Sequence, residues 1–166
     1  MMVFDIDSRI NPELLGLAWM LGHWEGTGNG ADMGGEDLEF AVTVDFTENG
    51  GNYLHYIMQL FEVDEEGHPT QSLGMETGFW RPKADGQVEV VIVHPEGIAE
   101  VYLGKIQGGK IELTTDIVAR TMTAEIPATG GHRLYGNVES DLMFTYDRGT
   151  TDRDLSPYIW ARLARV

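Results

Sequence analysis

The hydrophobic period of the chain changes at Gly22-His23-Trp24-Glu25-Gly26-Thr27-Gly28. Before this stretch, Asn11 can cap a helix, Pro12 suits its first position, and apolar residues at helical spacing predict a helix over residues 12–21. After it, segments rich in β-branched and aromatic residues alternate between apolar and polar positions, as strands do. Within the stretch, the indole and three glycines share one face of a strand. We expect Trp24 to pack under the helix, with a place in the wall of a ligand site as the alternative.

Glycine-bearing turns separate the strand segments, and they predict the fold. About ten strands joined by hairpin-length loops indicate antiparallel neighbours, and such a sheet exposes two edges unless it closes. We therefore predict an all-β, about ten-stranded antiparallel up-and-down β-barrel with the N-terminal helix as a plug. It forms one domain over residues 1–166, with an arm at residues 1–11. The turns are expected at residues 48–51, 64–67, 84–86, 95–97, 108–109 and 129–131.

Composition excludes several classes of function. The 166 residues include 27 acids and 11 bases, a net charge of −16 that repels nucleic acid and anionic membrane surfaces. The absence of cysteine excludes disulfides, zinc–thiolate sites and cysteine nucleophiles. The N-terminus has no signal-peptide pattern, and no apolar run approaches the roughly 20 residues that span a bilayer. A cytoplasmic protein without nucleic-acid or membrane partners is expected.

Four motifs together resemble the nitrobindin family of ferric-haem β-barrels. The first is Gly-x-Trp-x-Gly-x-Gly at residues 22–28, and the second is Glu-Thr-Gly-Phe-Trp-Arg-Pro at residues 76–82. The third is His-Pro-Glu-Gly-Ile-Ala-Glu-Val at residues 94–101. The fourth is Leu-Ser-Pro-Tyr at residues 155–158, followed by Ala161 and Leu163. The resemblance runs from about residue 12 to the end of the chain.

The resemblance implies both a fold and a chemistry. The barrel is expected to be of the calycin type, similar to fatty-acid-binding proteins, to hold haem b near one mouth and to form a homodimer. Family members bind nitric oxide reversibly and isomerise peroxynitrite to nitrate at the ferric haem. An enzyme activity of this kind is expected here only if haem is bound.

Two positions depart from the family pattern at the haem site. Tyr158 stands where the closing motif of the family has the axial histidine, and Glu125 stands where the family commonly has a lysine close to a haem propionate. Ordinary ferric-haem binding is therefore predicted to be lost or weakened, with a small apolar molecule such as a fatty acid as the occupant of the cavity. On this interpretation Tyr158→His alone recovers most haem binding and Glu125→Lys recovers little. A barrel that only contacts other proteins is a further alternative.

A ferric haem with a substitute ligand is the remaining alternative. Phenolate does bind haem iron, but free tyrosine titrates near pH 10, so ligation by Tyr158 at neutral pH costs about 4 kcal/mol unless its pKa falls. A neighbouring guanidinium could lower that pKa, and the candidates are Arg148, Arg153 and Arg162. His94 ends a strongly apolar run at a turn that the family places near the haem. It is the second candidate, as a ligand or as a distal hydrogen-bond donor.

The other four histidines are predicted to lie outside the site. His23 alternates with Trp24 and should face outward, and His68 lies in a turn. His132 is expected at the surface near the start of a strand, and His55 inside a strand as a hydrogen-bonded side chain. No two histidines have the spacing of a zinc site.

Overall fold

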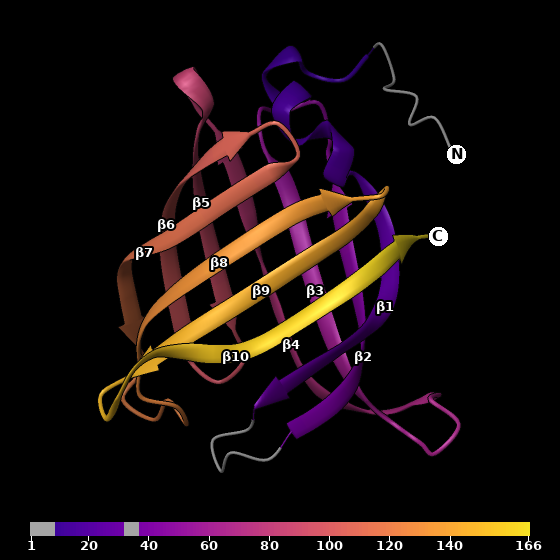
Figure 1. The fold of residues 1–166 in the computed structure, drawn as a ribbon. Coiled ribbons are helices and arrows are strands. Elements are labelled where there is room, and N and C mark those ends of the chain that lie inside the picture. The colour runs from indigo at the N-terminus through magenta and orange to yellow at the C-terminus, as the bar shows by residue number, and fades with distance from the viewer. Residues whose placement is uncertain (1–8, 32–36) are drawn as a thin grey trace.

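The computed structural model describes residues 9–31 and 37–166, which form ten strands and two short 3₁₀ helices (Figure 1). Each strand pairs antiparallel with its neighbours in sequence, and β1 also pairs with β10, so the sheet closes. The predicted ten-stranded up-and-down barrel is confirmed. The elements are η1 (Pro12–Met20), β1 (Gly22–Ala31), β2 (Asp37–Thr47), β3 (Leu54–Val63), β4 (Pro69–Pro82), η2 (Ala84–Gly86), β5 (Gln87–His94), β6 (Ile98–Gln107), β7 (Lys110–Arg120), β8 (Ala128–Val138), β9 (Asp141–Thr150) and β10 (Arg153–Arg165).

Helix η1 covers one end of the barrel, as predicted, but it is a 3₁₀ helix. The Asn11 side chain caps it by accepting a hydrogen bond from the backbone N–H two residues on. Leu14, Leu17 and Met20 are buried at the three-residue interval of such a helix, whereas Leu15, expected on the buried face, is 55% exposed. Neither helix among the described residues is long and apolar enough to cross a membrane.

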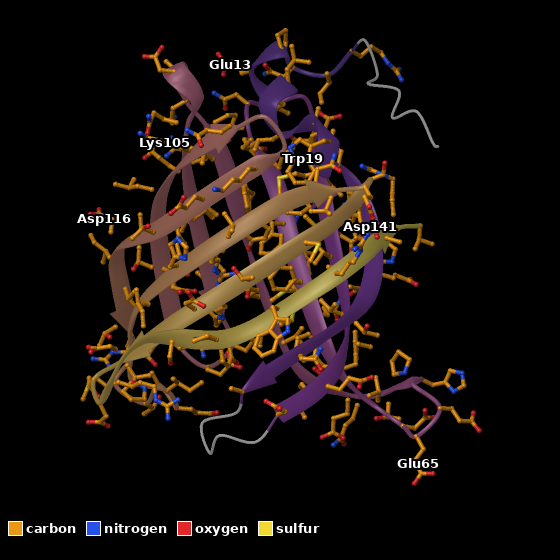
Figure 2. All side chains as sticks on the ribbon, in the orientation of Figure 1. Glu13, Trp19, Glu65, Lys105, Asp116 and Asp141 are labelled. Atoms are coloured by element: carbon orange, nitrogen blue, oxygen red, sulfur yellow. The ribbon has the colours of Figure 1, made fainter. Side chains whose placement is uncertain are left out.

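Trp24 lies under η1 and is fully buried, as expected. Its indole Nε1 donates a hydrogen bond to the Met20 carbonyl oxygen at 2.7 Å. The Arg165 guanidinium lies 4.2 Å from the indole ring and donates to the carbonyl oxygens of Trp19 and Leu21. Figure 2 shows Trp19 at this closed end. Helix η1, the start of β1 and the end of β10 are thereby joined around one aromatic side chain.

The glycines of β1 allow close packing of the barrel wall. A Cβ atom at Gly26 would lie 2.1 Å from the carbonyl oxygen of Arg162 in β10. A Cβ atom at Gly28 would lie 2.6 Å from the ring of Phe40 in β2. The bare face of this strand is therefore covered by β10 and by a phenyl ring.

The turn predicted at residues 129–131 is wrong. These residues lie inside β8, and residues 121–127 connect β7 to β8. Gly131 is buried, and a Cβ atom there would lie 2.6 Å from the Tyr102 hydroxyl oxygen and 3.0 Å from the Tyr146 ring. The glycine makes room for two side chains rather than for a turn.

The interior of the barrel has two different halves. Large apolar and aromatic side chains such as Phe46, Trp80 and Tyr135 fill the half beneath η1. The opposite end, which we call the mouth, is where β5 meets β6 and β9 meets β10. Figure 2 shows Glu65, in the β3–β4 connection, beyond this end. Among the described residues, the buried charged side chains are Glu76, Glu100, Arg133 and Arg148.

Candidate functional site

Four charged side chains enter the interior from four different strands near the mouth. Each occupies an inward position of its strand, two residues from another buried residue, because inward positions alternate along a strand. Glu100 is followed by Tyr102 in this way, and Arg133 is followed by Tyr135. The four are Glu76 on β4, Glu100 on β6, Arg133 on β8 and Arg148 on β9.

Arg133 is the centre of the group. Its Nη1 atom donates to Glu76 at 2.6 Å and its Nη2 atom donates to Glu100 at 3.1 Å. Its Nε atom donates to the Tyr102 hydroxyl at 2.9 Å, and its Cζ atom lies 3.8 Å from the centre of the Tyr146 ring. Burial alone would lower the pKa of Arg133, but the neighbouring carboxylates raise it well above its ordinary value. The side chain is therefore a charged guanidinium held between two carboxylates, and we call this group the Arg133 cluster.

Glu100 accepts four hydrogen bonds within the cluster. The donors are His94 through Nε2, Arg133, the Tyr102 hydroxyl at 2.5 Å and the Tyr146 hydroxyl at 2.8 Å. Burial alone would raise the pKa of Glu100. The Arg133 guanidinium and the hydrogen bond from His94 instead hold that pKa well below its ordinary value. Glu100 is thus an ionised carboxylate that orients two phenols and an imidazole.

Tyr158 lies at the entrance to the Arg133 cluster. The pairing of β10 with β9 is irregular between Pro157 and Ile159, so Tyr158 is an extra residue that turns its side chain toward the mouth. Its ring packs edge-on against Tyr146, with 5.4 Å between ring centres. The Arg148 guanidinium lies 4.2 Å from the centre of the Tyr158 ring and donates through Nε to the Tyr146 hydroxyl at 3.0 Å.

Of the three arginines predicted as neighbours of Tyr158, Arg148 is the one that stacks on its ring. Arg148 lies within β9. Arg162 points outward and pairs with two acidic residues at the β8–β9 turn, at 2.7 and 3.1 Å. Arg153, at the start of β10, is exposed and lines a small concavity together with Tyr158.

The structure brings together two of the three predicted site residues. His94 and Tyr158 line one concavity of about 40 Å³, although the Nε2 atom of His94 is bonded to Glu100. Glu125 does not reach this concavity. Its side chain is exposed, and its backbone N–H donates to the carbonyl oxygen of Glu96 at 3.4 Å. Glu125 therefore lies at the surface beside the β5–β6 turn of the mouth, and its side chain does not line the concavity.

The other four histidines lie outside the site, as predicted. His68 is exposed, and His55 bonds to Thr77 at 3.0 Å. His23 contacts Asp45 and Glu25, and His132 contacts Glu112. Among the described ranges, no three His, Cys, Asp or Glu residues are grouped as a metal site would require.

The mouth has little open space around Tyr158. Pockets for small molecules and cofactors have volumes of about 300–1,000 Å³. The two concavities that reach Tyr158 measure about 40 and 20 Å³. Phe40 covers the glycine face of β1, and Tyr102 and Tyr146 fill the space beside Gly131. The protein's own side chains therefore occupy most of the interior beside these glycines.

A larger concavity, of about 670 Å³, lies on the outer face of β1, β8, β9 and β10. Outward-facing side chains such as Thr27, Met143 and Trp160 line it. The sheet separates this surface from the interior, so it is not part of the mouth.

The sequence did not predict the Arg133 cluster. Glu76 and Glu100 both fall within motifs that resemble the family, and no contact between them and Arg133 is evident from those motifs. A signal was present, because Phe144-x-Tyr146-x-Arg148 places a cation on the same strand face as two aromatic residues. A charged residue in phase with core residues predicts either a partner or a site.

Comparisons with known proteins agree with the barrel fold. A family model described as THAP4-like, heme-binding beta-barrel domain matches residues 13–165. A "Ferric nitrobindin-like protein" of Cutibacterium acnes is 54% identical over 165 residues, which cover 99% of both chains. A "Peroxynitrite isomerase" of Nocardioides sp. is 40% identical over 164 residues, again covering 99% of both. The crystal structure of Rv2717c from M. tuberculosis matches with a TM-score of 0.81 at 29% identity, covering 95% of this chain and 99% of that one.

Proposed function

The chain belongs to the THAP4-like haem-binding β-barrel family, and we propose that it is a nitrobindin-like member whose ordinary ferric-haem binding is lost or weakened. Its mouth binds a small molecule instead. The observation that carries this proposal is Tyr158, which stands where the closing motif of the family has the axial histidine and whose ring packs against Tyr146 and the Arg148 guanidinium.

Haemin titration followed by absorption spectroscopy tests the proposal. The unmodified protein should form no tight one-to-one complex. Tyr158→His should recover most of the haemin binding, because it supplies a neutral imidazole at the position where the family has the axial histidine. Glu125→Lys alone should recover little. Tyr158→Phe is the matched control, and a tight complex with a histidine-type Soret band in the unmodified protein would refute the proposal.

The second candidate is a ferric haem held by Tyr158 or His94, with the nitric oxide and peroxynitrite chemistry expected of the family. It is supported by the concavity that the two residues share and by the Arg148 guanidinium, whose Cζ atom lies 4.2 Å from the centre of the Tyr158 ring. A phenolate charge-transfer band that disappears in Tyr158→Phe would establish this candidate. A histidine-type spectrum that disappears in His94→Ala would do the same for the imidazole.

The small apolar ligand predicted from the sequence has a partial basis at the mouth. Met58, Leu60 and Leu73 form an apolar wall of the concavity of about 40 Å³. Native mass spectrometry of the purified protein tests this ligand directly, because a retained fatty acid adds a defined mass. A barrel that serves only for protein contact would show no added mass.

A further inference from the structure

We propose that the mouth also binds a small planar oxyanion, a carboxylate or a nitrate group, with the Arg148 guanidinium as its principal ligand. This inference rests on the proposed function in one respect, namely that haem does not occupy the mouth. It adds a chemical class of ligand and a specific set of residues.

Arg148 is a buried cation that lacks a carboxylate partner. It is 7% exposed, and no carboxylate oxygen of a described residue lies within 4 Å of its guanidinium, whereas Arg133 holds two carboxylates. Its contacts are the Tyr146 hydroxyl and the faces of the Tyr146 and Tyr158 rings. Glu100 raises the pKa of Arg148 without contacting it. A buried charge without a direct charged partner is costly, so this guanidinium favours an anion from solution.

The terminal nitrogens of Arg148 are available to such an anion. Its Nε atom is bonded to Tyr146, but Nη1 and Nη2 have no acceptor among the described residues. The buried polar atoms that lack a partner in the described ranges are the indole nitrogens of Trp19 and Trp80. The Nη atoms are absent from that group, so solvent reaches them from the concavities that Arg148 lines.

One of these concavities has the lining of an anion site. It measures about 20 Å³ and adds a second guanidinium and three hydroxyl groups to Arg148. None of the three hydroxyl groups has a hydrogen-bond partner in the described part of the chain, and no carboxylate lines the concavity. The residues that line it besides Arg148 are Ala31, Thr150, Arg153, Ser156, Pro157 and Tyr158, of which Arg153 supplies the guanidinium and Thr150, Ser156 and Tyr158 supply the hydroxyl groups.

The geometry of the donors selects the ligand class. A guanidinium presents its two terminal nitrogens in one plane, which matches the two oxygens of a planar oxyanion. The concavity is small and open to solvent, so a compact anion fits better than a chain. The adjoining concavity contains Glu76 and Glu96, and the whole chain carries −16, both of which disfavour a polyanion. A monovalent planar oxyanion is the ligand that meets these conditions.

The test is an NMR titration of the full chain that follows the arginine Nε–H resonances. Sodium acetate and sodium nitrate are added in separate series, each against sodium chloride at the same ionic strength. We expect a saturable shift of the Arg148 resonance with acetate or nitrate, and no saturable shift for Arg162. Saturation with acetate alone indicates an organic acid as the natural ligand, and saturation with nitrate as well indicates a free inorganic oxyanion.

Variants make the assignment specific. Arg148→Met should weaken binding at least about tenfold, which is about 1.4 kcal/mol. Arg162→Met, which removes an outward-facing arginine from the same strand pair, should leave binding unchanged. Arg153→Gln with Ser156→Ala removes two lining groups without touching the buried cluster, and should weaken binding even if Arg148→Met fails to fold.

Two results would overturn the inference, namely equal shifts in chloride or undiminished binding in the folded variants. Haemin titration of the same sample separates this failure from that of the proposed function. A protein that takes up neither haem nor these anions contradicts the anion site alone. A protein that binds haem tightly contradicts the proposed function first.

Discussion

The two ends of the barrel are built from different interactions. At the closed end, η1 buries leucine side chains and the whole of Trp24, with a single hydrogen bond from the indole to Met20. At the mouth, two guanidiniums and two carboxylates are buried among tyrosines. Apolar burial stabilises a fold directly, whereas a buried ion pair is often no more stabilising than apolar residues of the same volume. The closed end therefore accounts for stability, and the mouth is the end whose residues need an explanation in terms of ligand or specificity.

The largest expected effect comes from removing the centre of the mouth. Arg133→Leu leaves the Glu76 and Glu100 carboxylates buried without their cation, and should lower the free energy of unfolding by about 5 kcal/mol. Urea denaturation measures this loss. Combining Arg133→Leu with Glu76→Gln and Glu100→Gln should recover most of it, because no charge is then stranded. A loss below about 1 kcal/mol for Arg133→Leu would mean that water reaches the cluster.

The matching change at the closed end is Trp24→Ala. It removes a fully buried indole and should cost about 3–5 kcal/mol, measured by the same denaturation. No second substitution at this end should rescue it, since the loss is one of packing rather than of charge balance. Trp24→Phe is the control that retains an aromatic ring. If Trp24→Ala costs less than about 1 kcal/mol, the closed end does not have the role assigned to it.

A smaller effect is expected from Gly131→Ala at the mouth. The new methyl group would lie 2.6 Å from the Tyr102 hydroxyl oxygen and 3.0 Å from the Tyr146 ring, so both phenols must shift away from Glu100. Overpacking of this kind costs about 1–3 kcal/mol. Gly130→Ala is the matched control, because its nearest neighbour is a Thr115 oxygen at 3.4 Å. Equal thermal stability of the two variants would show that the tyrosines adapt without cost.

The sequence predicts the closed end better than the mouth, and the reason is physical. Alternation and hairpin-length connections are local signals, so the ten strands and the buried Trp24 follow from them. The Arg133 cluster depends on partners that are distant in sequence, since Arg133 and Glu76 are 57 positions apart. No local sequence pattern indicates which strands face one another across a barrel. The turn predicted at residues 129–131 was wrong for the same reason, because Gly131 makes room for the side chains of Tyr102 and Tyr146 on other strands.

The smallest effect separates the two ends by the sign of their pH dependence. The folded-state pKa of Glu100 lies below its ordinary value, so its contribution to stability is full above about pH 4.5 and declines as pH falls below it. The slope is at most about 1.4 kcal/mol per pH unit for one proton, and Glu100→Gln should flatten the acid limb of a plot of stability against pH. His23, near the closed end, behaves oppositely. Its hydrogen bonds to Glu25 and Asp45 raise its pKa, so its contribution is full below about pH 6.5 and is lost as pH rises. Because the His23 side chain is partly exposed, His23→Gln should lower stability by less than about 1 kcal/mol, and only below that pH. An acid limb that is unchanged in Glu100→Gln would show that the mouth cluster does not hold its carboxylate ionised.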